Sequence, residues 1–185
     1  MLLQGLLILF IFLGLWYACH RLTRSIVSAS VSNRPDYYAM DVFVQHFSDS
    51  GQLYDELHTP FAQHNPVQNT TYLQKPILRL FASADTTWQL SANDGQIEDY
   101  RPIVTLWNNV FLIQTLAQQP RVAATQVATS YVVINLSDKT AVTPKPVTFI
   151  QPNQIVHAIG MHADFKTKII HLQHQVRAQL QMNNP

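Results

Sequence analysis

Short runs in which apolar and polar residues alternate restrict the fold of this sequence more than any other feature. Leu78 and Leu80 would share one face of an extended chain, with Arg79 on the other, and Trp88 and Leu90 alternate with polar residues in the same way. A period of two is typical of half-buried strands, whereas a helix repeats its apolar residues every three or four positions. The pattern therefore predicts antiparallel strands.

The alternation continues through the second half of the chain, interrupted by polar turn residues. Val104 and Leu106 precede Asn108 and Asn109, which we interpret as a turn, and the alternation resumes at Val110. A later run over 132–136 stops at Asp138 and Lys139, and the last run reaches almost to the C-terminus. Its apolar side carries Ile170, Leu172, His174, Val176, Ala178 and Leu180.

A weak internal repeat accompanies these runs. The segments 106–110 and 172–176 share a Leu-x-x-x-Val pattern, and each follows a segment of small residues. Strands at regular spacing, without long stretches of helical periodicity, favour a β-sandwich or an open jelly roll over a parallel sheet, which would need crossover helices. The predicted fold class is all-β, an open antiparallel β-jelly roll.

Composition sets the limits of this fold and excludes one class of partner. A chain of 185 residues that is 47% hydrophobic can form one domain with a core. The formal net charge is +1 and there is no run of like charges, so nothing indicates nucleic-acid binding. The sole cysteine, Cys19, cannot form an intramolecular disulfide, so packing and hydrogen bonds must hold the fold.

The N-terminal segment predicts a membrane anchor. From Leu2 to Cys19 the only strongly polar residue is Gln4, and as a helix this stretch would span about 27 Å. Trp16 and Tyr17 would lie at the headgroup level. We therefore expect one N-terminal transmembrane α-helix over 1–22, a linker over 23–34 and the β domain over 35–185.

Two other interpretations of the N-terminal segment have less support. A cleaved signal peptide would have basic residues before its apolar core, but the first is Arg21. A lipoprotein signal ending at Cys19 would need small residues where Trp16 and Tyr17 stand. An uncleaved span remains, and on charge alone Arg21 and Arg24 would lie on the cytoplasmic side, which would leave the body in the cytosol.

The sequence predicts neither catalysis nor a metal site. It lacks nucleophile, phosphate-binding and zinc-protease motifs, and five glycines offer little material for a phosphate loop. His171 and His174 are three positions apart, so on a strand they would face opposite sides, and the histidines at 58 and 64 are more dispersed. We expect no enzymatic activity, no cofactor and no metal.

Several segments together resemble one known family. They are TWQLSANDGQI from Thr87, VTLWNNVFLI from Val104, SYVVINLSDKTAVT from Ser130 and HAIGMHADFKTKIIHLQHQVRAQL from His157. In their order, and behind a single span and a linker, they resemble the LptC family over most of 70–180. No single motif is diagnostic, and the order of the segments carries the resemblance.

The resemblance implies a role in lipopolysaccharide export. It implies a single-pass inner-membrane protein with a cytoplasmic N-terminus and a periplasmic jelly roll, whose apolar slit shelters the acyl chains of lipid A. This orientation is opposite to the one that charge alone indicates. The implied partners are lipopolysaccharide, the LptB/LptF/LptG ABC transporter and the periplasmic bridge protein LptA.

Alternation and resemblance together indicate candidate site residues. The expected lipid-facing residues are Leu78, Leu80, Trp88, Leu90, Leu106, Val110, Leu112, Ile134, Leu136, Phe149, Ile170, Leu172 and Val176. The expected partner interface lies in the segment 160–180, with Gly160, Met161, Leu172, Val176 and Leu180.

Each of these assignments has a structural alternative. Inward apolar residues are ordinarily core, and Gly160 can be a simple turn glycine instead of a bulge. The alternative function is a membrane-tethered adaptor that scaffolds a complex without binding lipid.

Overall fold

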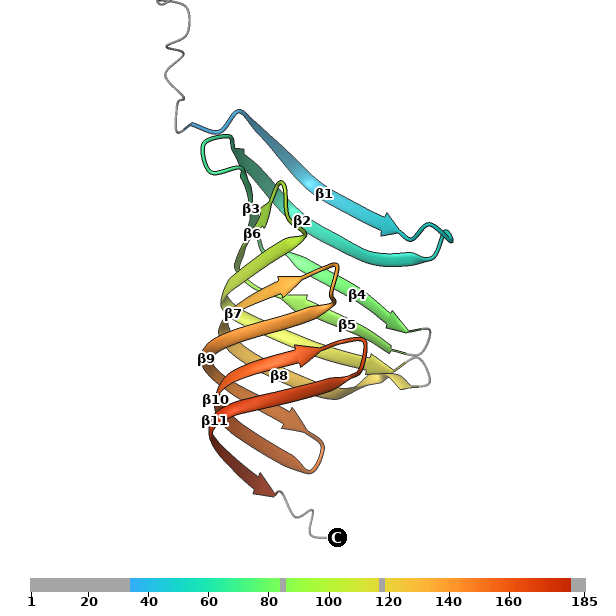
Figure 1. Cartoon of the computed structure of the whole chain (residues 1–185), viewed down its shortest axis with the longest axis vertical. Helices are drawn as coiled ribbons and strands as arrows, with labels where there is room; N and C mark the ends of the chain where they lie inside the picture. The colour runs from blue at the N-terminus through green and yellow to red at the C-terminus, as the bar shows by residue number, and fades with distance from the viewer. Residues whose placement is uncertain (1–33, 84–85, 117–118, 181–185) are drawn as a thin grey trace, which may run out of the picture. The chain divides into compact units, whose positions relative to one another are not determined.

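The computed structural model describes residues 34–83, 86–116 and 119–180, and these form an antiparallel sheet of 11 strands (Figure 1). The predicted transmembrane helix and nearly all of the predicted linker lie outside the described residues. Within the described residues we find no helix that could cross a membrane. The strands are β1 (Tyr37–Phe47), β2 (Leu53–Asn65), β3 (Thr70–Gln74), β4 (Ile77–Ser83), β5 (Thr86–Ser91), β6 (Asp94–Glu98), β7 (Ile103–Leu116), β8 (Gln119–Asn135), β9 (Thr140–Gln151), β10 (Gln154–Asp164) and β11 (Ile169–Leu180).

Strand order follows the chain closely, as expected of a sheet joined mainly by short connections. Figure 1 shows the strands succeeding one another from β1 at one end to β11 at the other. Near its first end the sheet divides, because β2 pairs with β4 through 55–58 and with β3 through 61–65. β7 rejoins the two branches, since it pairs with β6 through 104–107 and with β5 through 111–116.

Every long strand is interrupted near its middle, and these interruptions lie beside one another across the sheet. They are marked by left-handed backbone, proline or a shift in register. We call this line the corner row. It comprises Asp41, 59–60, 75–76, 92–93, 108–109, 130–132, 144–145, Gly160 and Gln175.

The corner row divides the sheet into two walls whose apolar sides share one core. Wall A contains β4, β5 and the segments 42–47, 53–58, 110–116, 119–129, 147–151, 154–159 and 174–180. Wall B contains β3, β6 and the segments 37–40, 61–65, 103–107, 133–135, 140–143, 161–164 and 169–172.

Asn108 and Asn109 do not form the turn that the sequence suggested, because β7 continues through them as a single strand. Both have left-handed backbone, with φ of 61° and 59°, and the register of β7 on β8 shifts there. Asparagine tolerates this conformation better than most residues. The Asn108 side chain donates to Asp94 Oδ2 over 2.7 Å, which ties the bulge to β6.

Both segments of the weak internal repeat cross the corner row. The segment 106–110 spans the corner row at 108–109, and the segment 172–176 spans it at Gln175, where φ is 50°. In the first segment Leu106 and Val110 are both fully buried, one in each wall. The shared pattern therefore marks a strand that bends at the corner row, and in the first segment the apolar side stays inward through the bend.

One kind of turn recurs at the free ends of wall B strands, opposite the corner row. Asn65, Asn135 and Asp164 each accept a hydrogen bond from a backbone N–H two or three residues later. Four residues after each of them stands a residue with left-handed backbone: Asn69, Lys139 and Lys168. These local bonds explain why polar turn residues separate the apolar runs.

Candidate lipid-binding interior

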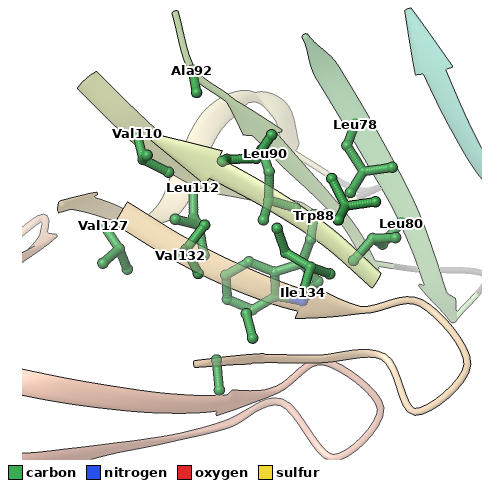
Figure 2. Close-up of a cluster of buried hydrophobic side chains, with 14 of the residues drawn as sticks. Leu78, Leu80, Trp88, Leu90, Ala92, Val110, Leu112, Val127, Val132 and Ile134 are labelled. Carbon is green, nitrogen blue, oxygen red and sulfur yellow. The ribbon is translucent and has the colours of Figure 1, made fainter. Parts of the chain in front are cut away.

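Alternation positions the predicted lipid-facing residues on the inner sides of the two walls. Figure 2 shows inward side chains from β4, β5, β7 and β8 gathered in one interior, with the indole ring of Trp88 among them. Eight of the predicted residues are at most 1% exposed: Leu78, Leu80, Trp88, Leu90, Leu106, Val110, Leu112 and Ile134. The structure therefore brings these eight together as a packed core.

The other five predicted residues lie toward the periphery of the interior. Leu136, Phe149, Ile170 and Leu172 are partly buried and pack against the core. Val176 is 52% exposed, because it lies on β11, where no further strand follows. Apolar surface thus remains accessible toward the end of the sheet that β11 forms.

A cavity of about 610 Å³ opens near the first end of the sheet. Tyr54 and Asp55 of β2 line it on one side, and Ile97, Leu136 and Ser137 line it from wall B and the β8–β9 turn. Leu136 is the one predicted lipid-facing residue among its lining residues. The sequence did not indicate the other lining residues, because they lie at strand ends where alternation stops.

Side chains from two wall B turns contact wall A along the side opposite the corner row. We call these contacts the seam: Tyr54, Phe81 and Trp88 in wall A, and Ser137, Lys139 and Phe165 in the turns. The Tyr54 hydroxyl donates to the Ser137 carbonyl oxygen over 3.1 Å, and Lys139 Nζ donates to the Phe81 carbonyl oxygen over 2.5 Å. The ring centroids of Trp88 and Phe165 lie 5.0 Å apart.

The seam contains a buried cation. Lys139 is only 5% exposed, and its Nζ also lies 3.7 Å from the centroid of the Tyr54 ring. Burial lowers the pKa of the Lys139 ammonium group, and the nearby Asp55 carboxylate opposes that shift. Burial likewise raises the pKa of the Tyr54 phenol. A carbonyl oxygen, an aromatic face and a carboxylate together offset the desolvation of the charge.

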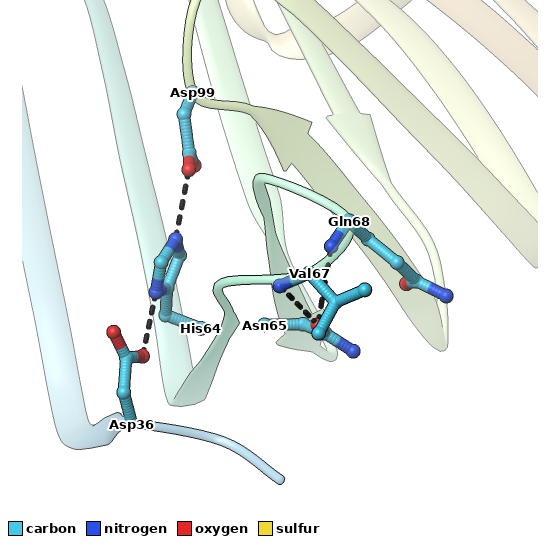
Figure 3. Close-up of polar contacts among 6 residues, drawn as sticks. All are labelled: Asp36, His64, Asn65, Val67, Gln68 and Asp99. Atoms are coloured by element: carbon cyan, nitrogen blue, oxygen red, sulfur yellow. Dashed lines mark hydrogen bonds and ion pairs between the residues drawn. The ribbon is translucent and has the colours of Figure 1, made fainter. Parts of the chain in front are cut away.

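The start of β1 is fastened to wall B through His64 (Figure 3). His64 Nδ1 lies 2.6 Å from Asp36 Oδ1, and Nε2 lies 2.8 Å from Asp99 Oδ2. The ring of Tyr37 stacks on the imidazole with centroids 4.6 Å apart. These two hydrogen bonds raise the pKa of His64. With a carboxylate on each nitrogen, the His64 ring ties the chain just before β1 to the β6–β7 turn.

The predicted partner interface is divided between two strands. Among the described strands, β11 pairs only with β10 and leaves its other side open, with Val176 and Leu180 exposed. Gly160 and Met161 lie one strand further in, because β10 pairs with β9 as well as β11. Gly160 has φ of 81° at a register shift, so a bulge and not a simple turn accounts for this glycine.

Comparison with known proteins identifies the family of this chain. The family model described as "Lipopolysaccharide-assembly, LptC-related" matches residues 6–181. This chain belongs to the LptC family. The resemblance seen in the sequence is thereby confirmed, and the protein has a role in lipopolysaccharide transport.

A solved structure supports the fold independently of the family model. It is that of LptH, the LptA-homologous periplasmic component of the lipopolysaccharide transport device of Pseudomonas aeruginosa. The TM-score is 0.50 at 10% identity, and the match covers 69% of this chain and 95% of LptH. A search of curated proteins gives no match. The likeness to LptH confirms the predicted antiparallel, jelly-roll-like β fold.

Proposed function

We propose that this LptC-family protein carries lipopolysaccharide between its two walls, from the LptB/LptF/LptG ABC transporter toward the LptA bridge. Residues 1–22 anchor it as a single-pass inner-membrane protein with a cytoplasmic N-terminus, and the β domain lies in the periplasm. The acyl chains of lipid A contact the predicted lipid-facing residues. The observation that carries this proposal is one apolar core shared by both walls, with apolar surface still accessible at Val176 and Leu180.

The energetics of transfer explain why such an interior is needed. Apolar surface exposed to water costs about 25 cal/mol per Å², so an acyl chain crossing the periplasm needs an apolar lining along its path. Alternation provides that lining, because every second residue of each strand faces the interior while its neighbours face water.

Room for an acyl chain arises when the walls move apart. Backbone hydrogen bonds between neighbouring strands hold each wall together, whereas side chains of the core and the seam hold one wall against the other. Rotation about the corner row therefore separates the walls without breaking strand pairing. An acyl chain that enters between the walls packs against residues such as Leu90 and Leu112. It replaces the contacts that the opposite wall made with them, so Leu90 and Leu112 stay out of water.

The open edge of β11 provides the route onward. An unpaired strand can add a strand of a neighbouring protein to its sheet, which would align two interiors end to end. Along the chain, β1 is the strand next to the proposed linker and β11 is the strand furthest from it. We assign the handover to LptA to Leu172, Val176 and Leu180 on β11, with Gly160 and Met161 supporting them from β10.

The scaffold hypothesis remains a second candidate, and one observation favours it. Eight predicted lipid-facing residues are at most 1% exposed, as expected of a core that only stabilises the domain. In that case the seam would stay closed, and β1 and β11 would join partner proteins without lipid passing between the walls.

Charge placed inside the interior distinguishes the two functions. Phe149 is partly buried and pairs with the buried residues Val127 and Val156, whereas its neighbour Ile150 is exposed. Phe149→Glu and the control Ile150→Glu are compared in cells that depend on this protein, after folding and partner binding have been verified. Lipid carriage predicts that export fails in Phe149→Glu alone. Normal export in a folded, partner-bound Phe149→Glu would support the scaffold.

A further inference from the structure

Within the part of the chain that the structure describes, two polar groups inside the interior have no hydrogen-bond partner. They are the Thr86 hydroxyl and the Trp88 indole N–H, on side chains that are each 1% exposed. Thr59 and Asp55 are also buried but are paired: the Thr59 hydroxyl lies 2.9 Å from the Phe61 carbonyl oxygen, and Asp55 Oδ1 lies 2.7 Å from His46 Nδ1. Among the described residues, Thr86 and Trp88 are the buried side chains left unsatisfied.

The two groups are adjacent on one face of the sheet. Thr86 and Trp88 are two positions apart on β5, and the burial pattern of that strand places them on the inner side with Leu90. Their cross-strand neighbours on the inner side include Leu80, which pairs with Trp88 from β4. From β7, Gln114 pairs with Trp88 and is partly buried. Two hydrogen-bond donors therefore follow one another along a lining that is largely apolar.

Leaving both groups unpaired destabilises the domain, since a buried donor without an acceptor loses its hydration and gains nothing in return. Natural proteins leave few such groups, and each one that persists calls for an explanation, such as a functional role or a bound water or ion. Substituting valine for Thr86 would remove one of them without changing side-chain shape. The unsatisfied donors thus point to an acceptor that a ligand supplies.

We propose that Thr86 and Trp88 form a polar subsite for the carbonyl oxygen of an acyl chain, an inference that rests on lipid carriage as the function. A carbonyl oxygen has two lone pairs and can accept from a hydroxyl and from an indole N–H. The carbonyl group of an acyl chain is attached to a long apolar chain, which can pack against the surrounding leucines. The subsite selects acyl chains over plain alkyl chains and fixes how far a chain enters the interior.

Two matched probes test this selection. One carries a tetradecanoyl chain amide-linked to glucosamine, and the other carries a tetradecyl chain ether-linked to glucose, so only the first has a carbonyl group. Each bears a photoreactive diazirine near the chain end. Both are presented to the full chain in bilayer nanodiscs, and the ratio of acyl to alkyl labelling at interior residues is measured by mass spectrometry.

The variants are Thr86→Val, which preserves shape, and Trp88→Phe, which keeps an aromatic ring but loses the N–H. Trp107→Phe is the control, because Trp107 packs against Tyr72 and is not among the lipid-facing residues. Wild type and Trp107→Phe should prefer the acyl probe about fivefold, as expected for one or two net hydrogen bonds. Thr86→Val and Trp88→Phe should each reduce this preference, because each removes one of the two donors, and Thr86→Val should also raise the thermal midpoint of the lipid-free protein.

The outcomes distinguish a failure of the subsite proposal from a failure of lipid carriage, the function on which it rests. If neither probe labels the interior of wild type, lipid carriage itself is wrong. If both probes label it equally, or if Thr86→Val leaves the preference unchanged, the subsite is wrong while lipid carriage stands. A fall in thermal midpoint in Thr86→Val would mean that a bound water already pairs with the hydroxyl, which would also overturn the proposal. Because Thr86→Val preserves shape, the test does not depend on whether Trp88→Phe folds.

Discussion

Lys139 Nζ donates a hydrogen bond to the carbonyl oxygen of Phe81 over 2.5 Å and so joins the β8–β9 turn of wall B to β4 of wall A. The same ammonium group lies over the ring of Tyr54, whose hydroxyl contacts the turn again at Ser137. These contacts lie on the side where the walls must part if lipid enters. The strength of the seam should therefore influence both stability and lipid access.

Lys139→Met should weaken the seam, because it removes the buried cation and leaves the Phe81 carbonyl oxygen without its donor. We expect the free energy of unfolding in urea to fall by about 1–3 kcal/mol. Lipid crosslinking from interior positions should rise at the same time. Lys168→Met is the matched control, since Lys168 also ends a turn with left-handed backbone but is exposed. Equal losses of stability in the two variants would contradict a special role for Lys139.

His64→Gln should reveal that the contribution of His64 to stability, through its contacts at the start of β1, depends on pH. The pKa of His64 is raised by its bonds to Asp99 and Asp36, so its contribution to stability is complete below the ordinary value of 6.5 and is lost as pH rises through the raised pKa. The pKa of Asp36 is lowered, mainly by the hydrogen bond from His64. Its contribution is complete above the ordinary value of 3.8 and is lost as pH falls through the lowered pKa.

The stability difference between wild type and His64→Gln should therefore be largest between pH 3.8 and 6.5 and shrink at alkaline pH. Thermal midpoints measured across this range check the prediction. His174→Gln serves as a control, because His174 is exposed on β11. A difference that grows as pH rises above neutrality would show that the His64 imidazolium does not hold Asp36 and Asp99.

Gly160→Ala should destabilise the outermost strand pair. Glycine at φ of 81° carries no steric penalty, whereas an L-residue there costs about 1–2 kcal/mol. A Cβ atom at this position would also clash with Gln173 Oε1, so the Gln173 side chain on β11 would have to move. Gly51→Ala is the control, because Gly51 has φ of 77° with no atom near its Cβ position.

Amide hydrogen exchange should show faster opening of β10 and β11 in Gly160→Ala and not in Gly51→Ala. Unchanged exchange at these strands would mean that the bulge does not determine how β11 is held.

Val176→Lys should separate docking from folding. Val176 is 52% exposed on the open edge strand, so the substitution should change stability by less than about 0.5 kcal/mol. Lysine on an edge strand opposes the addition of another strand, so binding to the bridge protein should weaken severalfold. Surface-immobilised binding measurements test this. Normal affinity of Val176→Lys for the bridge protein would show that the β11 edge does not bind that protein.

Alternation predicted much of the fold, because period-two burial is a local property of a strand. Leu78, Leu90 and Leu112 are buried as expected from their neighbours in sequence alone. Alternation alone could not predict where the strands bend at the corner row. Asn108 and Asn109 form a typical turn dipeptide, and only pairing with β6, β5 and β8 makes them a bulge within one strand.

The seam could not be predicted for a related reason. Lys139 and Phe165 lie in turns, where a lysine is ordinarily solvated and a single phenylalanine has no period to place it. Their burial depends on Phe81 and Trp88, which are distant in sequence. Similarly, the sequence marked Trp88 as apolar lining, but that its N–H lacks an acceptor is a property of the folded interior.

Site-specific photocrosslinking at Leu112 and Phe111 tests lipid carriage most directly. The two residues are neighbours on β7, but Leu112 is fully buried between the walls and Phe111 is 49% exposed on the outer face. During active export, a photoreactive residue at 112 should form adducts with lipopolysaccharide, and one at 111 should not. Adducts at 111 alone, or at neither position while export proceeds, would contradict passage of lipid through the interior.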